Sequence, residues 1–152
     1  PPLRGEVDRD ALRAGLADGT IDAVATDHAP HAPEEKEVEF DLAPPGTIGL
    51  ETALAVVLTD LVATGGLDLV RAIEALSTRP ARIMGAVGHG GPIEPGAPAN
   101  LVLIDPEGSW TVAAPFASKS RNSAFLGRTL RGRVVATFLR GEAIVLDGEA
   151  RR

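Results

Sequence analysis

Two of the three histidines of this chain lie beside a carboxylate, in the short segment that contains Asp27, His28 and His31. The segment follows the largely apolar run 21–25, whose length predicts a buried strand. Carboxylates and imidazoles bind metals and act as general acids and bases near neutral pH. In a β/α barrel, such groups gather where the strands end, at the C-terminal rim. The pattern therefore predicts a catalytic edge of a sheet at Asp27.

Composition excludes several classes of protein. The 152 residues carry a formal net charge of -6 and no long basic cluster, which argues against nucleic acid as a partner. With no cysteine, the chain has neither disulfides nor thiolate metal sites. The longest apolar run, 53–58, is too short to cross a bilayer. We therefore expect a cytoplasmic protein that does not insert into a membrane.

Hydrophobic periodicity predicts helices in the first part of the chain and strands in the second. Before residue 87 we expect four helices, over 6–17, 50–64, 68–76 and 80–84, with Asp68 as an N-cap. Between the first two helices we expect a strand over 21–26 and a long polar loop over 28–49. After the Gly- and Pro-rich stretch 88–98 we expect short strands, over 101–104, 110–112, 134–139 and 143–146. The expected organisation is α/β followed by a β-rich part.

These segments resemble, in order and over essentially the whole chain, the C-terminal part of bacterial class I dihydroorotases of the amidohydrolase superfamily. The similarity is carried by short motifs: Pro1-Pro2-Leu3-Arg4, Asp27-His28-Ala29-Pro30-His31, Ala43-Pro44-Pro45-Gly46, Gly49-Leu50-Glu51-Thr52, Ser77-Thr78-Arg79-Pro80 and Ser120-Arg121-Asn122. The resemblance implies an α/β fold. Residues 1–87 would form the C-terminal end of a (β/α)₈ TIM-type barrel, and residues 88–152 strands of a small flanking β-domain. A complete barrel needs roughly 250 residues, so we expect a fragment of a longer chain.

The resemblance also assigns roles to individual residues. It implies that Asp27 is both a metal ligand and the catalytic acid and base, and that His31 binds the substrate carboxylate. It implies that backbone groups of Pro45 and Gly46 contact the edge of the pyrimidine ring. The cofactor would be one or two Zn²⁺ ions, most of whose ligands lie upstream of this chain. We therefore expect the fragment alone to be inactive, because one carboxylate cannot hold a catalytic zinc.

The implied function is reversible cyclisation of N-carbamoyl-L-aspartate to dihydroorotate in pyrimidine biosynthesis. Two alternatives stay open: another cyclic-amide hydrolase, such as a hydantoinase or allantoinase, and an inactive dihydroorotase-like scaffold of aspartate transcarbamoylase. His31 favours the dihydroorotase function over the hydantoinase alternative, because hydantoinases generally lack a histidine at that position. The expected partners are the small-molecule substrate, the N-terminal remainder of the barrel, a second copy in a homodimer, and aspartate transcarbamoylase.

Other polar residues near these motifs receive less specific expectations. His28 either orients Asp27 or packs under the loop. His89 and the acidic run 34–37 are expected at the solvated surface. Arg121 and Asn122 could reach the active-site region, but we expect them mainly to make structural hydrogen bonds.

Overall fold

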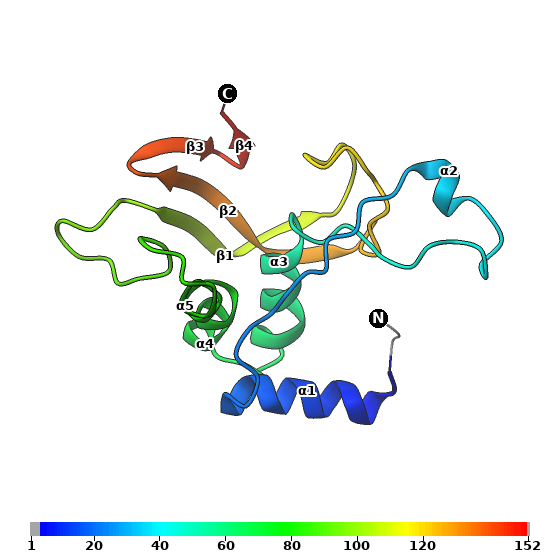
Figure 1. Ribbon diagram of the computed structural model, residues 1–152, viewed down its shortest axis with the longest axis horizontal. Helices are drawn as coiled ribbons and strands as arrows, with labels where there is room; N and C mark the ends of the chain where they lie inside the picture. The colour runs from blue at the N-terminus through cyan, green and yellow to red at the C-terminus, as the bar shows by residue number, and fades with distance from the viewer. Residues whose placement is uncertain (1–3, 152) are drawn as a thin grey trace.

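The computed structural model describes residues 4–151, with helices in the first part of the chain and an antiparallel sheet in the second (Figure 1). Pro1, Pro2 and Leu3, which carry part of the first motif, lie outside the described residues. The helices are α1 (Glu6–Asp18), α2 (Pro33–Lys36), α3 (Ala53–Val57), η1 (Leu58–Val62), α4 (Leu69–Ile73), η2 (Glu74–Thr78) and α5 (Arg79–Met84). The strands, in sheet order, are β1 (Leu101–Thr111), β2 (Thr129–Leu139), β3 (Glu142–Leu146) and β4 (Glu149–Ala150). The expected change from helices to strands is confirmed.

The expected helices are present with altered bounds. The helix predicted over 50–64 begins at Ala53 and continues from α3 into the π-helical turn η1. Just before this helix, the N–H groups of Gly49 and Leu50, which have no acceptor within the helix, donate to the Nδ1 of His28. Asp68 caps α4 as expected, since its carboxylate accepts a hydrogen bond from the N–H of Arg71 at 2.8 Å.

The prediction of a strand over 21–26 is wrong, because these residues form no strand in the described part of the chain. The segment lacks regular strand pairing, and only one isolated parallel bridge forms near its end, between His28 and Thr47. A barrel strand is defined by hydrogen bonds to parallel neighbours. All four strands of residues 4–151 belong instead to the antiparallel sheet that begins at Leu101. The segment is held partly by a helix, through a 3.0 Å hydrogen bond from Val24 N to Ala75 O.

The strands β1 and β2 are longer than the sequence pattern predicted. The runs expected at 101–104 and 110–112 belong to one strand, β1, which is interrupted by a register shift between Asp105 and Ser109. The interruption has a local cause, because Asp105 Oδ1 accepts hydrogen bonds from the N–H groups of Glu107 and Gly108, both at 3.0 Å. Such side-chain bonds compete with the ladder of the sheet. The apolar pattern of the sequence is therefore interrupted between the two runs, although the strand continues.

Helix α3 joins two apolar clusters that together form the core. One lies among the helices and contains Leu16, Val57, Leu67, Ala72 and Ala75. The other lies against the sheet and contains Ala55, Val112 and Leu130. Ala55 and Val57 therefore bury opposite sides of α3, one toward β1 and β2 and the other toward α1 and α4. No helix of residues 4–151 has the length and apolar character needed to span a bilayer.

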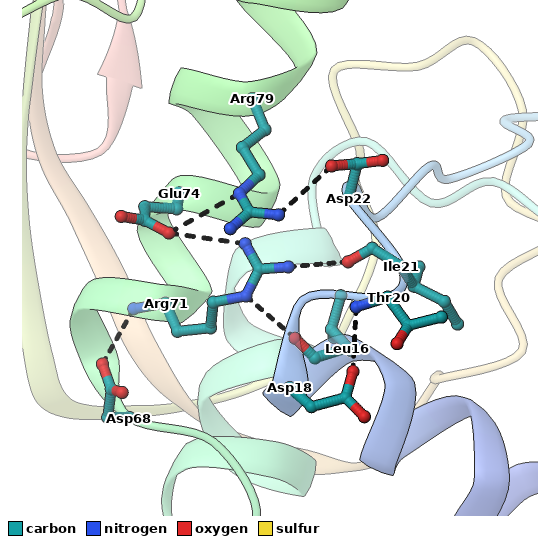
Figure 2. A network of polar contacts seen from close by, with 9 residues as sticks. All are labelled: Leu16, Asp18, Thr20, Ile21, Asp22, Asp68, Arg71, Glu74 and Arg79. Atoms are coloured by element: carbon teal, nitrogen blue, oxygen red, sulfur yellow. Dashed lines mark hydrogen bonds and ion pairs between the residues drawn. The ribbon is translucent and has the colours of Figure 1, made fainter.

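A buried arginine ties the helices to the extended segment that leads to Asp27 (Figure 2). Arg71 is only 7% exposed, and its guanidinium donates to Leu16 O at 2.8 Å and to Ile21 O at 2.6 Å. The remaining guanidinium nitrogen, Nη1, lies 3.4 Å from Glu74 Oε2. Arg79 extends the network outward from Glu74 to Asp22, with ion-pair distances of 3.7 and 3.2 Å. Because every arm of Arg71 has a partner, the charge is tolerated inside the fold.

We predict that Arg71→Met in the complete protein lowers the free energy of unfolding by about 2–4 kcal/mol, because the buried carbonyl of Leu16 and the partly buried carbonyl of Ile21 lose their donor. Arg79→Met is the matched control, and its partly exposed ion pairs predict a loss below about 1 kcal/mol. Denaturant unfolding of both variants measures the difference. Equal losses would show that Arg71 contributes no more than an ordinary surface pair.

Candidate active site

Asp27 ends the extended segment in an unusual backbone conformation. Its φ is 46°, in the left-handed region that few residues other than glycine adopt, and its side chain is exposed. Such a conformation costs free energy and persists where the surrounding structure enforces it, as often happens in active sites. The kink leaves the carboxylate accessible at the point where the chain leaves the helical core.

His28 is fixed by the backbone of the chain that precedes α3. Its Nδ1 accepts hydrogen bonds from Gly49 N at 3.1 Å and from Leu50 N at 3.3 Å. Because backbone N–H groups only donate, this nitrogen is the acceptor and the ring hydrogen lies on Nε2. Of the two roles left open by the sequence, the structure shows the second, since the ring supports the end of the loop.

His31 lies between a carbonyl and a carboxylate. Its Nε2 is 3.2 Å from Pro45 O, and its Nδ1 is 3.4 Å from Glu35 Oε2. Glu35 is itself held in place, because it also accepts a 3.0 Å hydrogen bond from Ala32 N at the start of α2. The structure therefore brings His31 together with Pro45, and orients the ring from both sides.

Gly46 occupies a position that a larger residue would not fit. Its φ is 121°, and a Cβ placed on it would lie 2.6 Å from the Cβ of Ala29 and 3.4 Å from His31 Nε2. Lys36 closes the loop, since its Nζ donates to Pro44 O at 2.7 Å and to Gly46 O at 3.1 Å. The expectation that the run 34–37 lies at the solvated surface is therefore wrong for Lys36, which is partly buried. Glu35 is exposed as expected, although its carboxylate contacts His31 and Ala32 N.

Asn122, from the long loop between β1 and β2, connects the parts of this site. Its Oδ1 accepts a hydrogen bond from His31 N at 3.2 Å, and its Nδ2 donates to Ala29 O at 2.8 Å and to Gly46 O at 3.4 Å. The expected structural hydrogen bonding is confirmed, and it falls on the residues singled out for substrate binding. The sequence carried only a weak signal for this contact, because about ninety positions separate Asn122 from His31.

Asp27 is the one expected metal ligand that the described residues contribute at this edge. No cluster of three or more His, Asp or Glu side chains able to hold an ion occurs within residues 4–151. An exposed carboxylate suits one position in a metal site, whereas a catalytic zinc normally has three protein ligands. Asp27 therefore fits a metal only as a contributor to a set completed by residues outside this segment.

Comparison with known proteins identifies relatives along nearly the whole chain. A model of the amidohydrolase family matches residues 2–144. The chain is 55% identical over 149 residues to a dihydroorotase of Leifsonia xyli, and 53% identical over 150 residues to one of Streptomyces coelicolor. These alignments cover 97% and 98% of this chain but 34% and 35% of those proteins. The chain thus spans about a third of the length of the curated relatives that it matches.

Solved structures with the same fold include hydantoinases. An L-hydantoinase (dihydropyrimidinase) from Arthrobacter aurescens matches with a TM-score of 0.88 and 31% identity, over 100% of this chain and 35% of that one. A D-hydantoinase from a Thermus species matches with a TM-score of 0.85 and 31% identity, over 99% of this chain and 34% of that one. The likeness confirms the expected fold class, because it shows that the helices and sheet are a part of the amidohydrolase fold.

We predict that Gly46→Ala lowers the free energy of unfolding of the complete protein by about 2–4 kcal/mol, from an unfavourable φ and from crowding against Ala29. Gly96→Ala is the control, because Gly96 also has a positive φ of 89° but no atom near its hypothetical Cβ. The control should lose only about 1–2 kcal/mol. The difference between the two, measured by denaturant unfolding, reports the close approach to Ala29 together with the larger φ of Gly46. Indistinguishable losses would mean that the loop yields freely.

Proposed function

The chain belongs to the amidohydrolase family, and we propose that the complete protein is a dihydroorotase that interconverts N-carbamoyl-L-aspartate and dihydroorotate in pyrimidine biosynthesis. One observation carries this choice of reaction. About half of the residues are identical to those of dihydroorotases along almost the entire chain, whereas the hydantoinases of known structure named above share 31%. The arrangement of Asp27, His31 and Gly46 supports it, because it places an accessible carboxylate on the same short segment as a recognition loop.

Asp27 is proposed as the group that moves the proton. Amidohydrolases generally use metal ions, and we propose one or two Zn²⁺ ions here, with Asp27 as one ligand. Such a metal, when bound, supplies hydroxide at neutral pH by lowering the pKa of water. In ring opening, Asp27 takes the proton from the attacking hydroxide and returns it to the nitrogen that leaves the carbonyl carbon. Ring closure runs through the same transfers in reverse.

Substrate recognition is assigned to the loop that contains His31, Pro45 and Gly46. His31 is proposed to bind the substrate carboxylate through Nε2, which would exchange its 3.2 Å contact with Pro45 O for one with the substrate. The carbonyls of Pro45 and Gly46 already face His31 and Lys36, so their oxygens are engaged within the protein. The N–H of Gly46, in contrast, donates to no group among residues 4–151, and Gly46 is exposed. We propose that this N–H, together with the carbonyl oxygen of Pro45, which has a second lone pair, contacts the edge of the pyrimidine ring.

The remaining partners and the domain division follow from the same proposal. We propose that residues 1–87 belong to the barrel and residues 88–152 to a flanking β-domain, and that the missing metal ligands come from the N-terminal remainder of the barrel. A cytoplasmic location, a homodimer and association with aspartate transcarbamoylase are proposed on the same basis. The change from helices to an antiparallel sheet supports the division, because the sheet begins at Leu101.

Turnover by the complete, metal-loaded protein tests the proposed reaction. Dihydroorotate, hydantoin and allantoin are offered in parallel, and dihydroorotate should give the highest kcat/KM. Faster turnover of hydantoin or allantoin would replace the proposal with the cyclic-amide hydrolase alternative. No turnover of any of them, with stable binding to aspartate transcarbamoylase, would support the inactive scaffold.

We predict that Asp27→Asn lowers kcat for dihydroorotate by about 10²–10⁴-fold, because asparagine matches the shape of aspartate but cannot accept and return the proton. Asp22→Asn is the control. Asp22 lies on the same extended segment and pairs with Arg79 at 3.2 Å, so its loss should leave kcat near that of the unmodified enzyme. Steady-state kinetics at saturating metal distinguish the two. If Asp27→Asn keeps more than about a tenth of kcat, Asp27 is not the base.

We predict that His31→Ala lowers kcat/KM by roughly 10- to 150-fold, mainly through KM, since a charge-assisted hydrogen bond to the substrate contributes about 1.5–3 kcal/mol. The metal should stay bound, because His31 is assigned to the substrate. His89→Ala, an exposed turn histidine, is the control and should behave as the unmodified enzyme. Metal content and kinetics are measured on the same preparation. Loss of metal would make His31 a ligand, and unchanged kinetics would make it an ordinary loop residue.

A further inference from the structure

We propose that Asn122 is a positioning residue that holds the recognition loop in its substrate-binding geometry. The inference rests on the proposed function, since it concerns recognition of the same substrate by His31 and Gly46. Asn122 belongs to the loop between β1 and β2, and it has no assigned role in the reaction. It acts through its side-chain amide, which joins the segment after Asp27 to the loop that contains Gly46.

The amide uses both of its ends. Its oxygen accepts the N–H of His31 at 3.2 Å, which fixes the backbone from which the imidazole extends. Its nitrogen donates to Ala29 O at 2.8 Å and, at the longer distance of 3.4 Å, to Gly46 O. An amide is suited to this task because it combines an acceptor and two donors in one plane. The three bonds connect the two recognition elements to a common point.

The backbone of Asn122 is anchored independently of its side chain. Its carbonyl accepts hydrogen bonds from Ile48 N at 3.2 Å and from Thr47 Oγ1 at 2.9 Å. The same loop is held at a second place, where Glu51 accepts hydrogen bonds from Ala117 N and Ser118 N at 2.9 and 3.1 Å. Substitution of Asn122 therefore removes the amide contacts while the backbone of the loop keeps its attachments.

The chain contains a matched control, because its other asparagine makes the same kind of bridge far from the recognition loop in sequence. Asn100 donates through Nδ2 to Gly88 O at 2.7 Å and accepts from Arg140 N at 2.8 Å. Loss of the Asn100 amide removes two comparable hydrogen bonds at the start of the sheet. A general structural role of asparagine bridges would give similar kinetic effects at both positions, whereas the positioning role gives them only at Asn122.

The experiment is a double-mutant cycle in the complete enzyme with dihydroorotate as the substrate. Asn122→Ala, His31→Ala and the double variant are compared with the unmodified enzyme, and Asn100→Ala is the control. Asn122→Asp is included because it preserves volume and the acceptor for His31 N, but replaces a donor with a carboxylate beside two carbonyl oxygens. KM, kcat, metal content and melting temperature are measured for each variant.

We expect Asn122→Ala and Asn122→Asp to lower kcat/KM by about 10- to 100-fold, as loss of two or three neutral hydrogen bonds predicts, with the effect mainly in KM and with metal content unchanged. In the His31→Ala background the same substitution should cost clearly less, because the part of its effect that passes through His31 is then already lost. Asn100→Ala should leave KM and kcat within about 2-fold of the unmodified enzyme, even if it lowers the melting temperature.

Three results would overturn the inference: equal costs of Asn122→Ala in the two backgrounds, an effect on kcat alone, or an Asn122→Asp enzyme with unchanged KM. If Asn122→Ala fails to fold, the isosteric Asn122→Asp variant decides alone. Failure of the proposed function is distinguishable, because it appears as absent dihydroorotate turnover in the unmodified enzyme. Normal turnover of the unmodified enzyme with additive variants refutes only the role of Asn122.

Discussion

The backbone between Ile21 and His31 is extended but has almost no sheet partners within the described chain, and the structure depends on how this segment is held. A buried carbonyl or N–H without a partner is costly, so an isolated extended segment requires substitutes for a ladder. They come from several places: Arg71 donates to Ile21 O, Ala75 O accepts from Val24 N, and Asn122 donates to Ala29 O. Side chains and helix carbonyls here do part of what neighbouring strands do in a closed barrel.

This arrangement explains why Arg71 is buried although it is charged. Its guanidinium has five donors in a fixed plane, and two of them reach carbonyls on either side of the turn between α1 and the extended segment. Glu74 balances the charge of Arg71 and also pairs with Arg79, which in turn pairs with Asp22 (Figure 2). Neighbouring Asp18 stabilises the same turn, where its contact with Thr20 lowers the pKa of the Asp18 carboxyl. The chain therefore enters the extended segment from a defined point and in a defined direction.

Elements set by local patterns were predictable from the sequence, and contacts between distant residues were not. The apolar stripe of the helix after Leu50 and the N-cap Asp68 depend on neighbours a few positions away, and both are present. The strand at 21–26 depends on pairing with other strands, which no pattern within the segment contains. Asp27, His28 and His31 were recognisable because two of the three histidines of the chain lie within a few positions of a carboxylate in one short segment. The partners of Asn122 and Lys36 were not predictable, because an asparagine or a lysine in a polar loop does not reveal which distant backbone groups its side chain contacts.

The two tasks of the proposed site are supported by different parts of the fold. The segment before Asp27 is held from the helical side, by Arg71 and by the carbonyl of Ala75. The loop with His31 and Gly46 is held from the other side, by Asn122 and Lys36. Contacts of packed and hydrogen-bonded groups couple mainly to their immediate neighbours. Residues of the proposed recognition loop can therefore change while the segment before Asp27 keeps its hydrogen bonds, as expected of a fold that can carry sites for different substrates.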